Sequence, residues 1–317
     1  MDTTIFDKHG ILLRRDAIDL GFDDDWLARM RRAGLIVRLR HGAYASADVW
    51  ETADRARRHD LTSRAVMQQY DDRVALSHQS NLIRIGGPDW GLDLTTVHVT
   101  NLFGRGDRTK AGITHHRGEC RAGDLTRIDG HWALTPGRAA VETALLASRD
   151  PAVAVLDWVM NVGLATPAEL HDLVDRILLE WPGSVDLPHK LGLANGRRES
   201  VGETRTGLFL DDHKFTGAEP QWKVFRPDGR LAGVADFALH RERVMIEFDG
   251  KIKYGRLLKP GQRIEDVIMA ERARERLLEE LTGYLIFRII WADLERPQAT
   301  AERLRQFIAA SALRRAG

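Results

Sequence analysis

The chain has 317 residues, of which 43% are hydrophobic, 29% charged and 7% aromatic, and this composition excludes long-range disorder and collagen-like repeats. The most apolar stretch, residues 152–165, is too short for a membrane span and contains Asp157, and the acidic N-terminus is unlike a signal peptide. The single cysteine, Cys120, excludes an internal disulfide and a cysteine-based zinc site, so we expect a cytoplasmic protein of two or three domains with no membrane partner.

Two short helices and a hairpin are predicted at the N-terminus. After the apolar segment 11–13, RRDAIDLG is typical of a helix that ends at Gly21, and DDDWLARMRRAG of a second helix that ends at Gly34. In LIVRLRHGAYA, alternating residues flank a tight turn at His41 and Gly42, which predicts a β-hairpin. The order of helix, turn, helix and hairpin is that of a winged helix-turn-helix domain, which binds DNA.

The charge of this segment is uneven. Residues 1–60 contain eleven Lys or Arg and eleven Asp or Glu, but residues 26–45 contain five arginines and no acid. Arginines on a second helix and a wing favour phosphate and groove contacts, so we expect DNA to contact Arg29, Arg31, Arg32, Arg38, Arg40 and His41. The alternative is a solvated helix face. Because the acids at 23–25 oppose phosphate binding at the helix N-terminus, we expect the contacts from the helix body and the wing.

Residues 48–70 are predicted to form one amphipathic helix that leads into a middle region of short strands and loops. VALSHQSNLIRIGG predicts a strand and a helix, LTTVHVTN a strand, and DLTRIDGHWALT a hairpin that turns at Asp129 and Gly130. A helix follows that opens at Thr135 with Pro136 in its first turn. Two further helices are predicted over 151–163 and 166–180.

Histidines in this middle region raise the question of a metal site. His98 and the pair His115 and His116 are candidate ligands, but no carboxylate lies near them at ligand spacing. We therefore expect these side chains to be surface or core histidines.

The C-terminal region carries acidic residues in strands that are otherwise apolar. A helix is predicted over RRESVGETRTGLFLDDHKF, with Glu203 near its centre, and it is followed by three strands, QWKVF, LAGVADFAL and RVMIEFD. Asp236 lies in the middle strand, and Glu247, Asp249 and Lys251 share one face of the next. A lone buried carboxylate is costly, so acids on two adjacent strands favour a divalent cation, Mg²⁺ or Mn²⁺, with Glu203 as a third carboxylate.

The order αβββ with Asp and then Glu-x-Asp-Gly-Lys resembles the PD-(D/E)XK nuclease superfamily, above all its Vsr-related branch. The residues that match are Glu203, Asp236 and the run 247–250, and residues 264–278 and 284–294 resemble that branch's closing helix and strand. One departure is that Asp249 occupies the place of the superfamily's lysine. Lys251 lies two residues later on the same strand face and is the candidate substitute.

The N-terminal part is similar to the winged helix of AbiEi-type antitoxins in its pattern RRDAIDLG…LARMRRAGLIVRLRHGAYA. The middle, LSHQSNLIRIGG…TVHVT…DGHWALTPGRAAVET, resembles the domain that follows this winged helix in the same proteins. These resemblances imply an α+β protein: a winged helix-turn-helix over 1–60, an α/β linking domain over 61–194, and a restriction-endonuclease-like domain over 195–317.

Two functions are compatible with these resemblances. The first is a DNA endonuclease that hydrolyses phosphodiesters with Mg²⁺ or Mn²⁺ in phage defence or a toxin–antitoxin system. Its expected metal ligands are Asp236 and Glu247, with Asp249 as a supporting ligand and Glu203 assisting. Lys251 is expected to polarise the water or the phosphate. The second is an antitoxin or autorepressor without catalysis, whose C-terminal domain binds a cognate toxin or a second copy of the chain. The acidic set favours the enzyme, and the displaced lysine favours the repressor.

Overall fold

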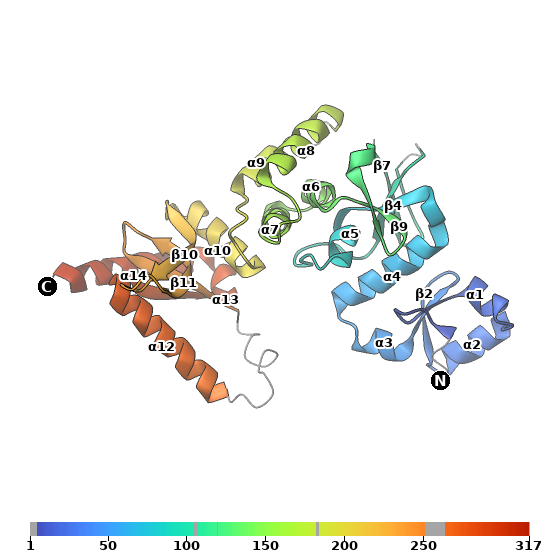
Figure 1. Ribbon diagram of the computed structural model, residues 1–317, viewed down its shortest axis with the longest axis horizontal. Helices are drawn as coiled ribbons and strands as arrows, with labels where there is room; N and C mark the ends of the chain where they lie inside the picture. Colours follow the sequence, from blue (N-terminus) through green and yellow to red (C-terminus); the bar gives the residue numbers. More distant parts are fainter. Residues whose placement is uncertain (1–4, 104–106, 119, 182–183, 251–263, 317) are drawn as a thin grey trace. The chain divides into compact units, whose positions relative to one another are not determined.

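The computed structural model describes residues 5–103, 107–118, 120–181, 184–250 and 264–316. The chain divides into two compact units, residues 1–192 and 193–317, which we describe one at a time. The first unit contains a three-stranded and a six-stranded sheet, and the second a four-stranded sheet, each packed against helices (Figure 1). Within the described ranges, no helix is long and apolar enough to cross a membrane. The chain is therefore a mixed α+β protein.

The N-terminal part of the first unit has the predicted order of helices and hairpin. Its elements are β1 (Ile11–Leu13), α1 (Arg14–Asp19), α2 (Asp24–Arg32), β2 (Ile36–Arg40) and β3 (Ala43–Ser46). The strands pair antiparallel in the order β1-β3-β2. Gly21 and Gly34, with φ of +89° and +69°, follow the two helices, as the sequence predicts. Leu12, Leu27 and Ile36 pack together between the helices and the sheet.

The single helix predicted over 48–70 is wrong, because the chain forms two helices there. α3 (Ala47–Thr52) is followed by Ala53, whose backbone is extended. α4 (Arg55–Tyr70) begins two residues later. Asp54 accounts for the break: its side chain accepts a hydrogen bond from the backbone N–H of Arg57 at 2.8 Å, the contact of an N-cap. The boundary that we place after residue 60 falls inside α4.

The remainder of the first unit is a six-stranded sheet with helices. The strands are β4 (Val74–Leu76), β5 (Val97–Asn101), β6 (Arg108–Lys110), β7 (Ile113–Arg117), β8 (Leu125–Ile128) and β9 (His131–Leu134), and the helices are α5 (His78–Arg84), α6 (Pro136–Leu146), α7 (Arg149–Asn161), α8 (Pro167–Glu180) and α9 (Leu187–Leu193). The strand order is β6-β7-β5-β4-β9-β8, with parallel pairs β5–β7 and β4–β9. The predicted hairpin is β8–β9, and its turn residues Asp129 and Gly130 both have positive φ.

Helices cover the two faces of this sheet. Val66 and Met67 of α4 pack against Val97, Val99 and Ile113 on one face. α5 packs against β5, and α6 packs against α5. The side chains of β5 and β7 that alternate with Val97, Val99 and Ile113 therefore point to the opposite face of the sheet, where α5 lies.

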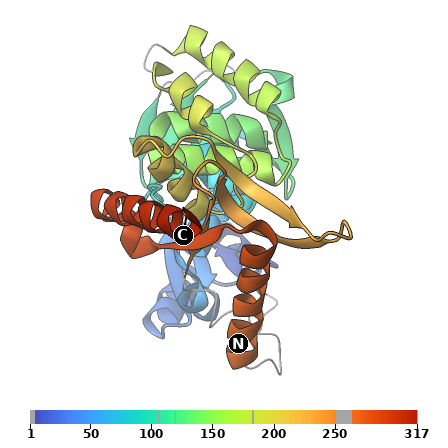
Figure 2. The same cartoon turned by 90° about the vertical axis from the view of Figure 1, so that its left-hand side faces the viewer.

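The second unit has the predicted helix and three strands, followed by a helix, a parallel strand and two more helices. The elements are α10 (Val201–Asp212), β10 (Ala218–Phe225), β11 (Leu231–Leu239), β12 (Val244–Asp249), α12 (Ile264–Thr282), β13 (Leu285–Ile290), α13 (Trp291–Leu294) and α14 (Pro297–Ala316). The sheet order is β10-β11-β12-β13; β10, β11 and β12 pair antiparallel, and β13 pairs parallel to β12. Figure 2 shows α12 and α14 running in different directions from this sheet.

Alternation along β12 divides the core of this unit between two faces. Ile246 packs with Phe287 and with Leu304 of α14, whereas Met245 packs with Leu278 of α12. Glu247 and Asp249 follow Met245 at intervals of two residues, so their side chains point to the same face of the sheet, which α12 covers.

α10 begins later than predicted, so Glu203 lies in its first turn and not near its centre. Ser200 is the N-cap and accepts a hydrogen bond from the backbone N–H of Glu203 at 3.2 Å. At the second position of the helix, a Cβ on Gly202 would lie 2.0 Å from the ring of Phe248, so only glycine permits this contact between α10 and β12.

Candidate functional site

The arginines predicted to contact DNA lie on α2 and on the β2–β3 hairpin of the first unit. We call this set the arginine surface, and its members are Arg29, Arg31, Arg32, Arg38, Arg40 and His41. All of these side chains are exposed except that of Arg40, which is half-buried. Within the described part of the chain, no ion pair to an acidic residue is found for any of the five arginines. The charges of the four exposed arginines, Arg29, Arg31, Arg32 and Arg38, are therefore available to a ligand.

Two of the three acids at the start of α2, Asp23 and Asp24, are engaged locally, and the third, Asp25, is exposed. Asp23 is the N-cap of α2 and accepts a hydrogen bond from the backbone N–H of Trp26 at 2.7 Å. Asp24 forms a two-pronged ion pair with Arg14, at 2.7 and 2.6 Å, and its hydrogen bonds from Arg14 lower the pKa of its carboxyl. Asp23 thus caps α2, and Asp24 links α2 to Arg14 of α1, which offsets its charge.

Two arginines of the hairpin differ in environment. Arg38 is exposed, and its guanidinium lies 3.3 Å from Nδ1 of His41 across the turn. Arg40 is turned toward α4, where its guanidinium carbon lies 5.9 Å from the centre of the Tyr70 ring. Arg38 is therefore available for a phosphate contact, whereas part of Arg40 belongs to the packing between hairpin and helix.

In the second unit, the acidic residues of β11 and β12 lie on adjacent strands. Asp236 Oδ2 accepts a hydrogen bond from the backbone N–H of Phe248 at 2.8 Å. Glu247 is buried, and its Oε1 accepts a hydrogen bond from Nη2 of Arg274 in α12 at 2.9 Å. Asp249 is half-buried at the end of β12. We call these three residues, Asp236, Glu247 and Asp249, the acidic face.

Glu203 is engaged in a separate network at the start of α10. Its Oε1 accepts a hydrogen bond from Ser200 Oγ at 2.8 Å, and its Oε2 accepts from the backbone N–H of Glu199 at 3.0 Å and from Gln221 Nε2 at 2.8 Å. These hydrogen bonds anchor the start of the helix and link it to β10. Lys251, the expected substitute lysine, lies outside the described residues.

The acidic face fits a Mg²⁺ ion only in part. Two carboxylates with water can hold this ion, and Asp236 and Glu247 come from neighbouring strands. However, among the described residues no three carboxylates place oxygens within 4.8 Å of one another. The Arg274 guanidinium also already balances the charge of Glu247. The contacts described are one ion pair, at Glu247, and one hydrogen bond from the β12 backbone to Asp236.

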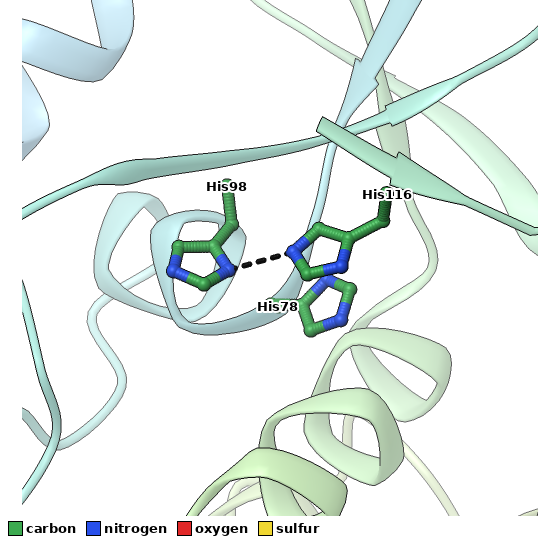
Figure 3. Close-up of side chains that lie close together, drawn as sticks. All are labelled: His78, His98 and His116. Carbon is green, nitrogen blue, oxygen red and sulfur yellow. Dashed lines mark hydrogen bonds between the residues drawn. The ribbon is translucent and has the colours of Figure 1, made fainter. Parts of the chain in front are cut away.

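The histidines of the middle region are closer together than the sequence indicates. His98 and His115 are buried, as we expect of core histidines. His98 and His116, however, form a cluster with His78, a residue that was not predicted from the sequence as a candidate ligand (Figure 3). Glu142, fully buried on α6, places Oε2 3.2 Å from Nδ1 of His78. Sequence spacing does not reveal this group, because its members come from one helix and two strands that meet only in the folded chain.

Comparison with known proteins supports the resemblance at the N-terminus. Residues 3–47 match the family model described as transcriptional regulator, AbiEi antitoxin, a range that contains β1, α1, α2, β2 and β3. The chain is also 25% identical over 279 residues to two proteins of Mycobacterium tuberculosis, one from strain CDC 1551 and one from strain H37Rv, both described as uncharacterized. The alignment covers 87% of this chain and 96% of each relative. The N-terminal segment that carries the arginine surface is therefore similar to an antitoxin-type regulator domain.

Proposed function

We propose that this protein is a DNA-binding transcriptional regulator of the antitoxin type, with a winged helix-turn-helix at its N-terminus. The observation that carries the proposal is the arginine surface, which coincides with the segment that matches the antitoxin regulator model. In this proposal α2 is the recognition helix and the β2–β3 hairpin is the wing. Exposed arginines without acidic partners are the groups that bind DNA phosphates.

The local engagement of Asp23 and Asp24 supports this assignment. Both acids are exposed at the N-terminal end of α2, but Asp23 accepts the N-cap hydrogen bond and Arg14 offsets the charge of Asp24, which reduces their repulsion of a phosphate. Arg29, Arg31 and Arg32 lie in the last turn of α2, away from these acids. DNA contacts are therefore proposed for the C-terminal half of α2 and for Arg38 on the hairpin. Partners in this proposal are duplex DNA and a cognate toxin, which the similarity to antitoxins suggests.

The test uses the full chain and two 30-base-pair duplexes, one from upstream of its own coding sequence and one of scrambled sequence. A variant with Arg29, Arg31 and Arg38 all changed to Ala should weaken binding to both duplexes, because phosphate contacts carry no sequence information. The matched control changes Arg230 to Ala, an exposed arginine of the second unit that pairs with Asp228. Equal affinity of the triple variant and the control for both duplexes would exclude the arginine surface as the interface.

A second candidate function is metal-dependent DNA cleavage by the second unit. One observation favours it: a helix, three antiparallel strands, a helix and a parallel strand follow each other in the order that the nuclease resemblance implies. Asp236, Glu247 and Asp249 are the proposed ligands of Mg²⁺ or Mn²⁺. When bound, this ion would supply charge stabilisation at a phosphodiester.

Nicking of supercoiled plasmid with 5 to 10 equivalents of Mn²⁺ or Mg²⁺ over protein tests this candidate. Wild type is compared with Glu247→Gln and with Glu302→Gln, which changes an exposed carboxylate on α14. Nicking by wild type and Glu302→Gln that is lost in Glu247→Gln supports cleavage at the acidic face. The same rate in all three proteins identifies a contaminant and leaves the regulator without a catalytic domain.

A further inference from the structure

Three histidines of the first unit meet beside the six-stranded sheet. His78 opens α5, His98 lies in β5 and His116 in β7. One ring nitrogen of each lies within 4.8 Å of those of the other two. His98 Nδ1 and His116 Nε2 are 2.8 Å apart, and the rings of His78 and His116 stack with centroids 3.8 Å apart (Figure 3). We call these three residues the histidine cluster.

The sheet topology accounts for this arrangement. β5 and β7 are parallel neighbours, with His98 paired to Thr114 and Thr100 paired to His116, so both histidines point to the same face two positions apart. His115 alternates with them and contacts Tyr70 of α4 instead, at 3.2 Å. The N-terminus of α5, which packs against β5, brings His78 to the same face.

His78, the member of the cluster on α5, has an unfavourable backbone conformation. Its φ is +51° at the first position of a helix, in the left-handed region that non-glycine residues rarely adopt. Such residues cost about 1 to 3 kcal/mol and concentrate at binding and catalytic sites. Its side chain is almost completely buried, so the surrounding structure fixes both backbone and ring.

Burial disfavours the charged form of the three imidazoles. Burial lowers the pKa of His98 to about 3 and that of His116 to about 4, and it places the pKa of His78 well below its usual value. Burial therefore does not favour an imidazolium at any of the three positions. The 2.8 Å contact between His98 Nδ1 and His116 Nε2 places a hydrogen on one of these two nitrogens, and this hydrogen must move before both nitrogens bind a cation.

From this geometry we propose that His78, His98 and His116 bind one divalent transition-metal ion of the zinc class. Imidazole nitrogens suit Zn²⁺, and three of them leave a fourth position for water or a small ligand. The 2.8 Å separation of His98 Nδ1 and His116 Nε2 is slightly shorter than the roughly 3.3 Å between ligands of a tetrahedral ion with bonds of about 2.0 Å. Small rotations of the two rings therefore admit the ion.

The groups around the cluster are those that support metal-bound histidines. Imidazole ligands usually donate their second ring N–H to a neighbouring acceptor. His98 Nε2 lies 3.2 Å from Thr96 Oγ1 and 2.9 Å from Nε2 of the Gln79 side-chain amide. The Gln79 Oε1 atom is buried and without a hydrogen-bond partner. Rotation of this amide would offer Oε1 to the Nε2 hydrogen in exchange for the 3.0 Å hydrogen bond that Gln79 Nε2 donates to the Asp93 backbone oxygen.

Glu142 is a positioning residue for the cluster. Its Oε2 lies 3.2 Å from His78 Nδ1, and its Oε1 accepts a hydrogen bond from Arg138 Nε at 2.8 Å. The carboxyl group lies beside the His78 ring, whose Nδ1 is also 3.0 Å from Ser77 Oγ, and when ionised it adds negative charge beside a dication in a buried site. A cavity of about 300 Å³, lined by Gln79, Asp93 and His98 among others, lies on the His98 side of the cluster.

The test uses the full chain without a histidine tag, stripped with chelator and titrated with Co²⁺ and then Zn²⁺. The proposal expects one equivalent of Co²⁺ to bind with the visible absorption of a four- or five-coordinate site, and Zn²⁺ to displace it. His98→Gln and His116→Gln should weaken binding at least 100-fold, and Glu142→Gln by roughly 10- to 100-fold. His115→Gln is the matched control, because it removes an adjacent buried imidazole outside the cluster, and it should bind as wild type does.

Two outcomes overturn the proposal. The first is a wild-type chain that binds no stoichiometric Co²⁺ or Zn²⁺, a result that does not depend on whether any variant folds. The second is one equivalent bound with equal affinity by wild type, His98→Gln and His116→Gln, which places the ion elsewhere in the chain. Circular dichroism of the metal-free variants separates lost ligation from lost folding, and a variant that remains folded yet binds no metal supports the assignment.

Discussion

Glu247 of β12 and Arg274 of α12 form an ion pair, with 2.9 Å between Oε1 and Nη2. Glu247 is buried, whereas about a third of the Arg274 side chain is exposed. Arg274 also donates to the backbone oxygen of Val234 in β11 at 3.1 Å, so one side chain connects α12 to two strands. The most buried carboxylate of the acidic face is thus held by an arginine from a distant part of the chain.

We predict that Arg274→Met lowers the free energy of unfolding by about 1 to 3 kcal/mol, because it leaves a buried carboxylate without its charged partner. Glu247→Gln in the Arg274→Met background should recover part of this loss. Urea unfolding of the four proteins of the double-mutant cycle measures the coupling. A coupling near zero would show that Arg274 contributes by packing alone.

Arg38 and Arg40 provide a test that separates DNA binding from folding. Arg38→Ala should leave stability within about 0.5 kcal/mol of wild type, since its side chain is exposed. It should reduce the slope of log binding constant against log salt concentration by about one. Arg40→Ala should instead lower the free energy of unfolding by about 1 kcal/mol, through loss of its contact with Tyr70.

The DNA affinity of the two variants is measured by fluorescence anisotropy with labelled duplex DNA, and their free energy of unfolding is measured by urea unfolding. Arg230→Ala, outside the first unit, supplies the baseline for both measurements. If Arg38→Ala binds DNA with the wild-type salt dependence, the hairpin does not contact the phosphates and the wing assignment fails.

Asp23 tests the start of the proposed recognition helix. Asp23→Ala removes the N-cap hydrogen bond to Trp26 and should cost about 1 kcal/mol. Asp25→Ala is the control, because Asp25 is an exposed residue inside the first turn. If the two variants melt at the same temperature, the Asp23 cap contributes nothing to stability.

Features encoded by neighbouring residues were predictable from the sequence. The turn at His41 and Gly42 and the helix end at Gly34 depend on a few adjacent residues, and the structure contains both. The break at Asp54 had a local signal too, since Asp is a preferred N-cap. Ser200 followed three residues later by Glu203 is likewise a capping signature, and it marks the true start of α10.

The contacts that define the two sites were not predictable in this way. Arg274 lies 27 residues after Glu247 in the chain, and it contacts Glu247 only because α12 packs on the sheet. His98 and His116 come together because β5 and β7 pair in parallel, although β6 lies between these two strands in sequence. No local pattern specifies such pairings, since they depend on long-range strand order.

The histidine cluster predicts how stability depends on pH in the metal-free chain. His98 and His116 titrate at about 3 and about 4 in the folded chain, because burial disfavours the charged ring, and their ordinary value is 6.5. Between pH 6.5 and 4 the unfolded chain therefore binds more protons than the folded chain, so the free energy of unfolding falls as the pH falls. Glu142 acts in the opposite sense: burial raises its pKa to about 7, so its contribution falls as the pH rises from 4.5 to 7.

Urea unfolding at pH 7.5 and pH 5.0, in the presence of chelator, isolates the histidine contribution. His98→Gln should reduce the loss of stability between these two pH values by about 1 to 2 kcal/mol relative to wild type, because one imidazole no longer protonates on unfolding. Glu142→Gln should enlarge the loss, since it removes the group of opposite sign. His171→Gln, at an exposed position of α8, should leave the difference unchanged. The same loss in wild type and His98→Gln would mean that the His98 ring is already charged at pH 5.0 in the folded chain, and that burial does not keep the cluster neutral.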